Sequence, residues 1–224
     1  MDTTPYVQKT LFQLPYLSEE QMRAIIKPLH PFLWPLVMEP WDDLLERRGH
    51  DRMFTDMTED EMAIWLTMQA GKLARSVFHG REGIEVKTWY RKPVIVIPDA
   101  LAIVVKKLTK RRLRRRGPKQ LSRSNALTET NRNFWNQQHV DGLPDIPRVI
   151  FGYELIREAT EIRLYIAYPR TRGRGTEWAY RLRAPRVANP PFPKLKVIPI
   201  QDEQKPFTIS AAEPGDHKNA GGKG

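Results

Sequence analysis

Apolar residues recur at helical spacing in two segments of the N-terminal third of the chain. The first segment begins at Ser18, which forms a capping-box pattern with Gln21, and it ends before Pro28. The second segment begins with the same pattern at Thr58 and Glu61 and continues to the "RSVF" stretch. We therefore expect two capped helices, each burying one face, the second being the longer.

The stretch between these helices, "HPFLWPLVMEP", has too many prolines to predict a long helix. A short helix is expected only after it. Pro40 suits a first helical turn, and Gly49 suits the position just past the helix end.

Two apolar runs rich in β-branched residues flank Pro98-Asp99-Ala100, which predicts a hairpin. Their continuous apolar character predicts strands covered on both faces. Pro93 is expected at a strand start or on an edge. An alternating segment from Ile84 to Tyr90 predicts another strand before them.

The C-terminal half continues with a possible helix capped by Ser124 or Asn125 and a loop, "VDGLPDIP". Three strands, "RVIFGYEL", "EIRLYIAY" and "EWAYRL", follow it. The last two are joined by the Gly-containing hairpin loop "PRTRGRGT". Residues 201–224 have the composition of a disordered tail.

These elements predict an α+β fold, in which N-terminal helices pack on antiparallel β-hairpins and a meander. We divide the chain into a Pro-rich, short-helix region at 1–57, an α+β core at 58–200 and the tail at 201–224. The core carries a basic insertion at 106–124.

Composition narrows the possible partners. The chain has 224 residues and a formal net charge of +11, which favours nucleic acid, an anionic membrane or an acidic protein. The absence of cysteine excludes disulfides, thiolate metal sites and cysteine nucleophiles. No apolar run is long enough for a membrane helix, and the N-terminus lacks a signal-peptide pattern, so we expect a cytoplasmic protein without a membrane partner.

Positive charge is concentrated in two places. In "KKLTKRRLRRRGPK", nine of fourteen residues are Lys or Arg and none is acidic. The loop before the last strand supplies a second set, followed by Arg181, Arg183 and Arg186. The candidate phosphate-binding residues are Lys106, Lys107, Lys110, Arg111, Arg112, Arg114, Arg115, Arg116, Lys119, Arg170, Arg172 and Arg174.

Three interpretations of the first basic set remain open: a polyanion-binding surface, a solvated loop and a nuclear-localisation signal. Neighbouring aromatics either stack on bases or, as is more usual, belong to the core. These aromatics are Trp89, Tyr90, Phe134, Trp135, Trp178 and Tyr180.

Glu85 and Lys87 form an E-x-K pattern on a predicted strand, as in PD-(D/E)xK nucleases, where a carboxylate holds a divalent metal beside the lysine. Asp99 would be the second acid, but it follows the E-x-K instead of preceding it. Mg²⁺ is expected as a cofactor only if this nuclease alternative holds. Otherwise the sequence predicts no cofactor.

The histidines give no metal-ligand spacing, so no metal site is predicted. His139 and Asp141 form the only nearby pair with a general-base pattern. The glycines of "TRGRGT" lie between strands and lack the helix N-terminus of a phosphate-binding loop.

Residues 93–183 resemble, in the order of their elements, bacterial proteins carried on mobile elements. The resemblance rests on "VVKKL", a basic polar stretch, "GLPDIPRVIFGYEL", "TEIRLYIAYP" and "EWAYRL". It implies a toxin–antitoxin or phage-defence setting, which fits a nucleic-acid partner. It carries no catalytic residue over to this chain.

Our leading hypothesis is a nucleic-acid-binding protein with a regulatory or defence role. The first alternative is a metal-dependent nuclease or toxin that uses Glu85, Lys87 and Asp99. The second is an antitoxin-like interaction module that binds an acidic protein partner.

Overall fold

The computed structural model describes residues 14, 16–89, 92–112, 119–122, 133–170, 175–186 and 192–193, with backbone alone for 92, 111, 112, 119 and 120. The helices come first: α1 (Glu19–Ile26), α2 (His30–His50), α3 (Arg52–Thr55) and α4 (Glu59–Phe78). The strands are β1 (Glu85–Trp89), β2 (Lys92–Ile97), β3 (Leu101–Lys107), β4 (Thr109–Arg112), β5 (Lys119–Ser122), β6 (Arg148–Ile156), β7 (Glu161–Pro169) and β8 (Thr176–Leu182).

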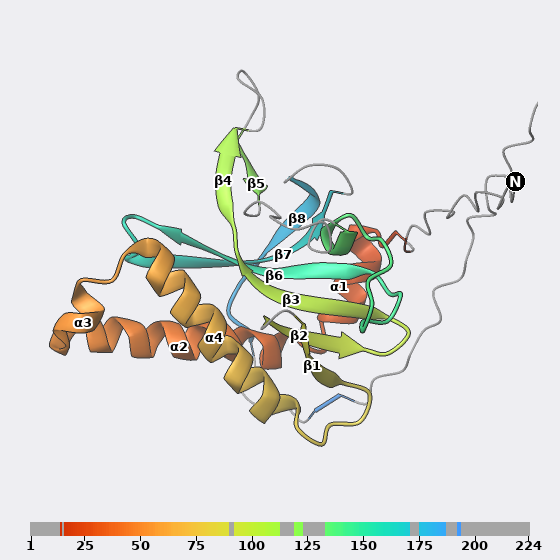
Figure 1. Ribbon diagram of the computed structural model, residues 1–224, viewed down its shortest axis with the longest axis horizontal. Coiled ribbons are helices and arrows are strands. Elements are labelled where there is room, and N and C mark those ends of the chain that lie inside the picture. The colour runs from red at the N-terminus through yellow and green to blue at the C-terminus, as the bar shows by residue number, and fades with distance from the viewer. Residues whose placement is uncertain are drawn as a thin grey trace, which may run out of the picture.

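Helices followed by a sheet confirm the predicted α+β class (Figure 1). Six strands form one sheet in the order β1-β2-β3-β6-β7-β8, while β4 and β5 pair only with each other. The expected hairpin of β2 and β3 and the meander of β6, β7 and β8 are both present and antiparallel. The turn of the first hairpin contains Asp99, whose φ is 57°.

The pairing of β3 with β6 is parallel, which makes the sheet mixed. A parallel pair needs a long crossover connection, because the chain must return to the same end of the sheet. Residues 108–147 provide that crossover, and the basic ribbon β4–β5 lies within it.

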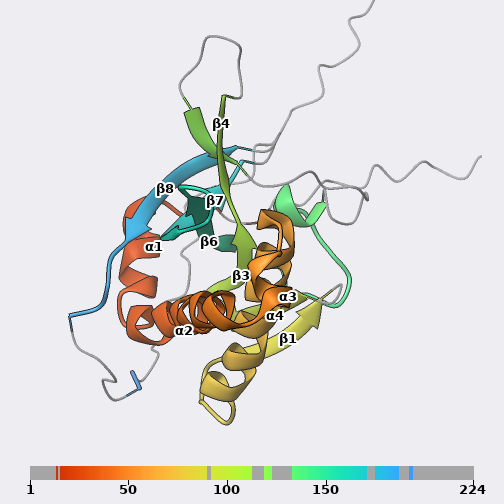
Figure 2. The same ribbon diagram turned by 90° about the vertical axis from the view of Figure 1, so that its left-hand side faces the viewer.

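Helices α2 and α4 pack together and cover one face of the sheet, which we call the helix face (Figure 2). Both predicted capping boxes are present, at Ser18 with Gln21 and at Thr58 with Glu61. Small residues of α4 are buried against the sheet, and a Cβ at Gly71 would lie only 2.6 Å from Pro93 Cγ. Pro93 lies near the start of β2, as expected.

The expectation of a short helix at 40–49 is wrong, because α2 is a single helix of 21 residues that contains Pro35 and Pro40. Each interior proline removes a backbone donor, at a cost of about 3 kcal/mol. Burying one large apolar side chain contributes about 1.5–3 kcal/mol, so several of them offset that cost. The side chains buried along α2 are Leu33, Leu36, Val37, Pro40, Trp41 and Leu44.

The opposite side of the sheet, which we call the ribbon face, has its own smaller core. Segment 133–147 covers it, with residues 133–135 helical and the remainder irregular. Trp89 stacks on Phe134 at 4.2 Å between ring centroids, and Trp135 packs edge-on against Phe134. All three rings are buried, so the core interpretation of these aromatics is correct.

Arg148, the first residue of β6, is fully buried under this segment. Its Nη1 donates hydrogen bonds to the carbonyls of Phe134, at 3.1 Å, and Gln138, at 2.6 Å. Gln137 bonds both the N–H and the carbonyl of Arg148. Burial lowers the pKa of Arg148 to about 10. The hydrogen bonds of the buried Arg148 side chain, which we call the Arg148 clasp, therefore hold segment 133–147 against the sheet.

Two predictions fall outside the described residues: a helix capped at Ser124 or Asn125, and the disordered tail at 201–224. Within the residues that the structure describes, no helix is long and apolar enough to cross a membrane.

Candidate nucleic-acid interface

Part of the first basic set, predicted as a basic insertion at 106–124, forms the antiparallel ribbon β4–β5. Arg111 pairs with Gln120, and Arg112 pairs with Lys119. Figures 1 and 2 both show the ribbon standing away from the sheet. Positive residues are therefore carried on an arm that leaves the body of the protein.

The root of the ribbon is fixed to the ribbon face by Leu108. Its N–H donates to the Tyr153 carbonyl at 2.8 Å, and its buried side chain lies over Gly152. A Cβ at Gly152 would come within 2.2 Å of Leu108 Cδ1, so only glycine permits this approach. Leu121 packs against the same core from β5.

A buried carboxylate lies beside this root. Glu154 of β6 accepts a hydrogen bond from the Tyr165 hydroxyl at 2.9 Å, and Lys110 Nζ lies 3.8 Å from it. Burial, with the hydrogen bond to Glu154, raises the pKa of Tyr165. Lys110 is still exposed, so it contributes to the ribbon surface while its charge balances Glu154.

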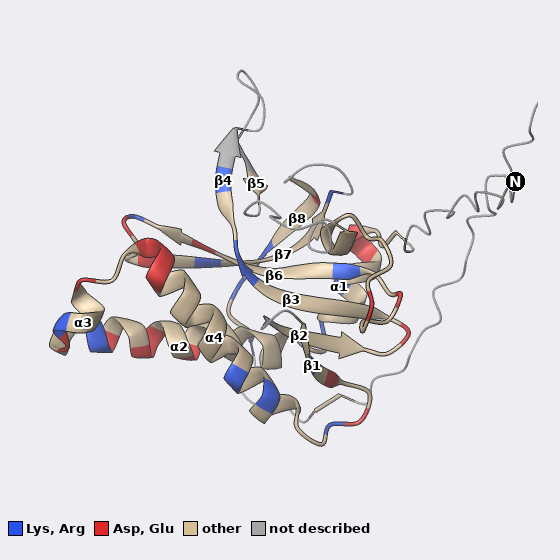
Figure 3. Ribbon diagram, viewed as in Figure 1, with Lys and Arg blue, Asp and Glu red and all other residues tan. Residues whose placement is uncertain are grey.

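Lys106 and Lys107, at the end of β3, both contact other parts of the protein. Lys107 Nζ lies 2.7 Å from Glu59 and 2.9 Å from Asp60 in the first turn of α4, which is coloured red in Figure 3. Burial acts to lower the pKa of Lys107, but the hydrogen bonds to these carboxylates raise it overall. Lys106 Nζ lies 5.4 Å from the Trp135 ring centroid. These two candidates therefore help to hold the fold together.

The second basic set adjoins the root of the ribbon. Ser122 of β5 forms an isolated antiparallel bridge with Gly175. Gly175 is the last residue of the loop between β7 and β8. Arg170 begins that loop, with its N–H bonded to the Gly175 carbonyl and its side chain 3.8 Å from Glu177. The hairpin of β2 and β3 and the hairpin of β7 and β8 belong to the same six-stranded sheet, whereas the ribbon β4–β5 is a separate two-stranded sheet. The bridge to Gly175 joins this ribbon to the loop of the second basic set.

Two strand arginines extend this surface across the ribbon face. Arg181 of β8 is exposed and pairs in register with Tyr165, while Arg163 of β7 pairs with Glu154. Arg163 is not among the candidates predicted from the sequence. Its signal is a cation within the strand "EIRLYIAY", whose residues after Arg163 are apolar or aromatic. Arg114, Arg115, Arg116, Arg172 and Arg174 lie outside the described residues.

Acidic residues are missing from the sequence around the ribbon. No Asp or Glu occurs between Asp99 and Glu129, and residues 169–186 contain Glu177 alone. The register also places two cations opposite each other, Arg112 and Lys119. Like charges at directly opposed positions destabilise an antiparallel pair.

The residues proposed for a nuclease do not form a metal-binding site. Glu85 and Lys87 make an exposed ion pair of 3.1 Å on the edge strand β1, and Asp99 lies in the turn after β2. No group of three His, Asp or Glu residues suitable for a metal ion occurs among the described residues.

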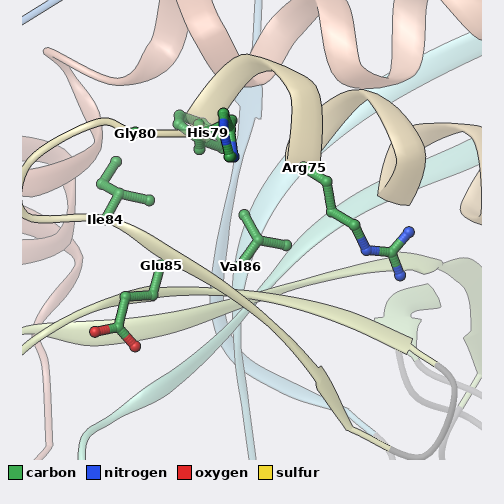
Figure 4. Close-up of a pocket in the computed structure, with 7 residues that line it drawn as sticks. Arg75, His79, Gly80, Ile84, Glu85 and Val86 are labelled. Atoms are coloured by element: carbon green, nitrogen blue, oxygen red, sulfur yellow. The ribbon is translucent and has the colours of Figure 1, made fainter.

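A pocket of about 350 Å³ lies between the end of α4 and β1, with Arg75, His79 and Glu85 in its lining. Figure 4 shows the Glu85 carboxylate and the Arg75 guanidinium pointing away from each other. Arg75 Nη2 instead reaches the Thr88 hydroxyl at 3.4 Å. The charged groups do not converge on one bound atom, which leaves this pocket without the geometry of a catalytic site.

The predicted pair of His139 and Asp141 is present, with 3.3 Å between Nε2 and Oδ1. Asp145 binds the other ring nitrogen at 2.9 Å. The hydrogen bond and charge of Asp145, followed by those of Asp141, raise the pKa of His139. A histidine whose two nitrogens are both bonded to carboxylates is suited to fastening a loop.

No family model matches the chain, and no curated protein or solved structure matches it significantly.

Proposed function

We propose that the protein binds nucleic acid and that the ribbon β4–β5 contacts the phosphates. The observation that carries this proposal is the projecting ribbon itself, whose strands bear Lys110, Arg111, Arg112 and Lys119 and no acid. Its bridge from Ser122 to Gly175 joins it to the second basic set.

The physical basis is electrostatic. Each phosphate that a Lys or Arg neutralises releases condensed counterions, so this surface gains most from a polyanion with closely spaced charges. Arginine is the commoner cation in both sets, and its planar fork matches phosphate oxygens with paired hydrogen bonds. The mobile-element proteins that the chain resembles suggest a regulatory or defence setting for this binding.

The test is fluorescence anisotropy of a labelled nucleic acid titrated with the full chain over a range of salt concentrations. The variant carries Arg111→Gln, Arg112→Gln and Lys119→Gln. We expect its log–log salt slope to be shallower by about 2.7, at about 0.9 per lost phosphate contact on duplex DNA. Near physiological salt, this predicts a loss of affinity on the order of 100-fold.

A matched control removes the same total charge from the other side of the molecule, through Lys27→Gln, Arg52→Gln and Lys72→Gln. These side chains are exposed: Lys27 is the C-cap of α1, Arg52 lies on α3 and Lys72 lies on α4. We expect their loss to leave the salt slope nearly unchanged. Equal effects of the two variants would mean that the ribbon acts only through the net charge of the protein and is not the site of phosphate contact. Binding of an acidic protein in place of any nucleic acid would overturn the proposal.

A further inference from the structure

We infer that the ribbon β4–β5 enters the major groove of duplex DNA. This inference rests on the proposed function and specifies the nucleic acid and the groove. Three features of the described residues support it: the dimensions of the ribbon, the residue types on its two faces and the burial of the nearby aromatic rings.

The dimensions favour one groove. Two paired strands lie about 4.8 Å apart, and four residues of strand extend about 13 Å. The major groove of B-form DNA, about 12 Å wide and 8.5 Å deep, admits a two-stranded ribbon. The B-form minor groove is only about 6 Å wide. The major groove of A-form RNA is too narrow and deep for side chains to read.

The residues paired across the ribbon suit two kinds of contact with DNA, one to the base edges and one to the phosphates. Arg111 and Gln120 are opposed and share one face of the ribbon by the two-residue period of a strand. Arginine and glutamine are the side chains that pair with the major-groove edges of guanine and adenine. Arg112 and Lys119 are opposed in the same way, so the other face of the ribbon carries two cationic residue types suited to phosphate contacts.

Single-stranded nucleic acid fits this surface less well. Proteins that bind single strands stack the bases on exposed aromatic rings. The rings near the root of the ribbon include Tyr165, whose hydroxyl bonds the buried carboxylate there, Trp135, which lies under Lys106, and its neighbours Phe134 and Trp89. All four are buried in the core of the ribbon face, so they offer no stacking platform.

The experiment compares two duplexes of identical sequence, one of them with glucosylated 5-hydroxymethylcytosine in place of cytosine. The glucose fills the major groove and leaves every phosphate in place. With the full chain, we expect the glucosylated duplex to bind at least about tenfold more weakly, because one lost base contact alone is worth that factor. The salt slopes measured with both duplexes provide the phosphate readout.

The variant Arg111→Gln, Arg112→Gln, Lys119→Gln is titrated with the same two duplexes, and we expect it to bind both about equally. Equal binding of the unmodified protein to both duplexes would overturn the major-groove inference while the proposed function stood. Tighter binding to duplex RNA or single strands of the same sequence would also overturn it. Failure to bind any of these probes would defeat the proposed function itself.

Discussion

The two faces of the six-stranded sheet are made by the same strands but are covered in different ways. Helices α2 and α4 cover the helix face with an apolar core. The irregular segment 133–147 and the root of the ribbon cover the ribbon face. Among the described residues, the buried polar or charged side chains that do not belong to tyrosine all lie on this second side. They are Ser122, Gln137, Arg148 and Glu154.

This difference separates two tasks within one domain. An apolar face packed by helices gains stability that changes little with salt or pH. Buried charges are costly unless hydrogen bonds satisfy them, but they fix the position of irregular chain. On the ribbon face, that position determines where the basic arm stands. We therefore expect substitutions on the two sides to differ in kind as well as in size.

The largest effect is expected for Arg148→Ala. The substitution leaves the carbonyls of Phe134 and Gln138 without their donor and opens a cavity beneath segment 133–147. We expect a loss of about 3–5 kcal/mol in the free energy of unfolding, measured by urea denaturation. Segment 133–147 should also lose protection from hydrogen exchange more than α4 does.

The outcome that contradicts this prediction is a stable Arg148→Ala protein with unchanged exchange in segment 133–147. A matched substitution on the helix face is Leu66→Ala, in the fully buried middle of α4. We expect it to lower the free energy of unfolding by about 2–5 kcal/mol. Its exchange pattern should be the reverse, with α4 losing protection first.

The next effect comes from the two glycines that permit close approach, one on each face. Gly152→Ala places a methyl group against the buried Leu108 side chain, and we expect overpacking to cost about 1–3 kcal/mol. Gly71→Ala meets Pro93, but alanine recovers about 1 kcal/mol of helix propensity, so a smaller net loss is expected. Thermal unfolding compares the two directly.

Nucleic-acid titration sharpens this comparison. Because Leu108 begins the ribbon, Gly152→Ala should displace its root and weaken binding, while Gly71→Ala should leave the affinity unchanged. If both variants bind equally well, the position of the root does not control the ribbon.

Elements specified by local signals could be predicted from the sequence. The capping boxes at Ser18 and Thr58 are short-range patterns, and the β-branched runs around Asp99 have a turn between them. The prolines of α2 are also a local signal, and they wrongly predicted that no long helix forms there. Burial of the face containing Leu36 and Trp41, which decides the outcome, depends on α4.

The candidate site could be predicted only in part. Charge density marked the basic set, but it did not show that Arg111 and Arg112 lie on a paired strand. The pairing of Lys107 with Glu59 joins residues far apart in the sequence, and no spacing rule reveals it. The parallel pair of β3 and β6 is hidden for the same reason, since a long crossover separates the strands.

A smaller effect is expected for Tyr153→Phe on the helix face. The Tyr153 hydroxyl donates to the Ala63 carbonyl at 2.6 Å and lies 2.9 Å from the Thr67 hydroxyl. Burial raises the pKa of Tyr153, so the ring remains neutral at ordinary pH. We expect a loss of about 1–2 kcal/mol that does not depend on salt, measured by urea denaturation at two ionic strengths. A strong salt dependence would contradict the apolar character of this face.

The smallest effect concerns His139 on the ribbon side and is seen through pH. Asp145 and Asp141 raise its pKa above the ordinary value of 6.5. A raised folded-state pKa stabilises the fold fully below the unfolded-state pKa, and this contribution disappears as pH rises through the folded-state pKa. Wild-type protein should therefore have a higher Tm than Asp145→Asn below that ordinary value, and the difference should shrink in alkaline solution.

An NMR titration of the His139 ring isolates this contact from other groups. Asp145→Asn should return the pKa of His139 toward its ordinary value, and Asp141→Asn should lower it less, because Asp145 makes the shorter contact. Equal shifts from the two variants would mean that Asp145 and Asp141 raise the pKa of His139 by the same amount. Because both carboxylates and the ring are exposed, salt should screen the whole effect, in contrast to the buried clasp of Arg148 on the same side.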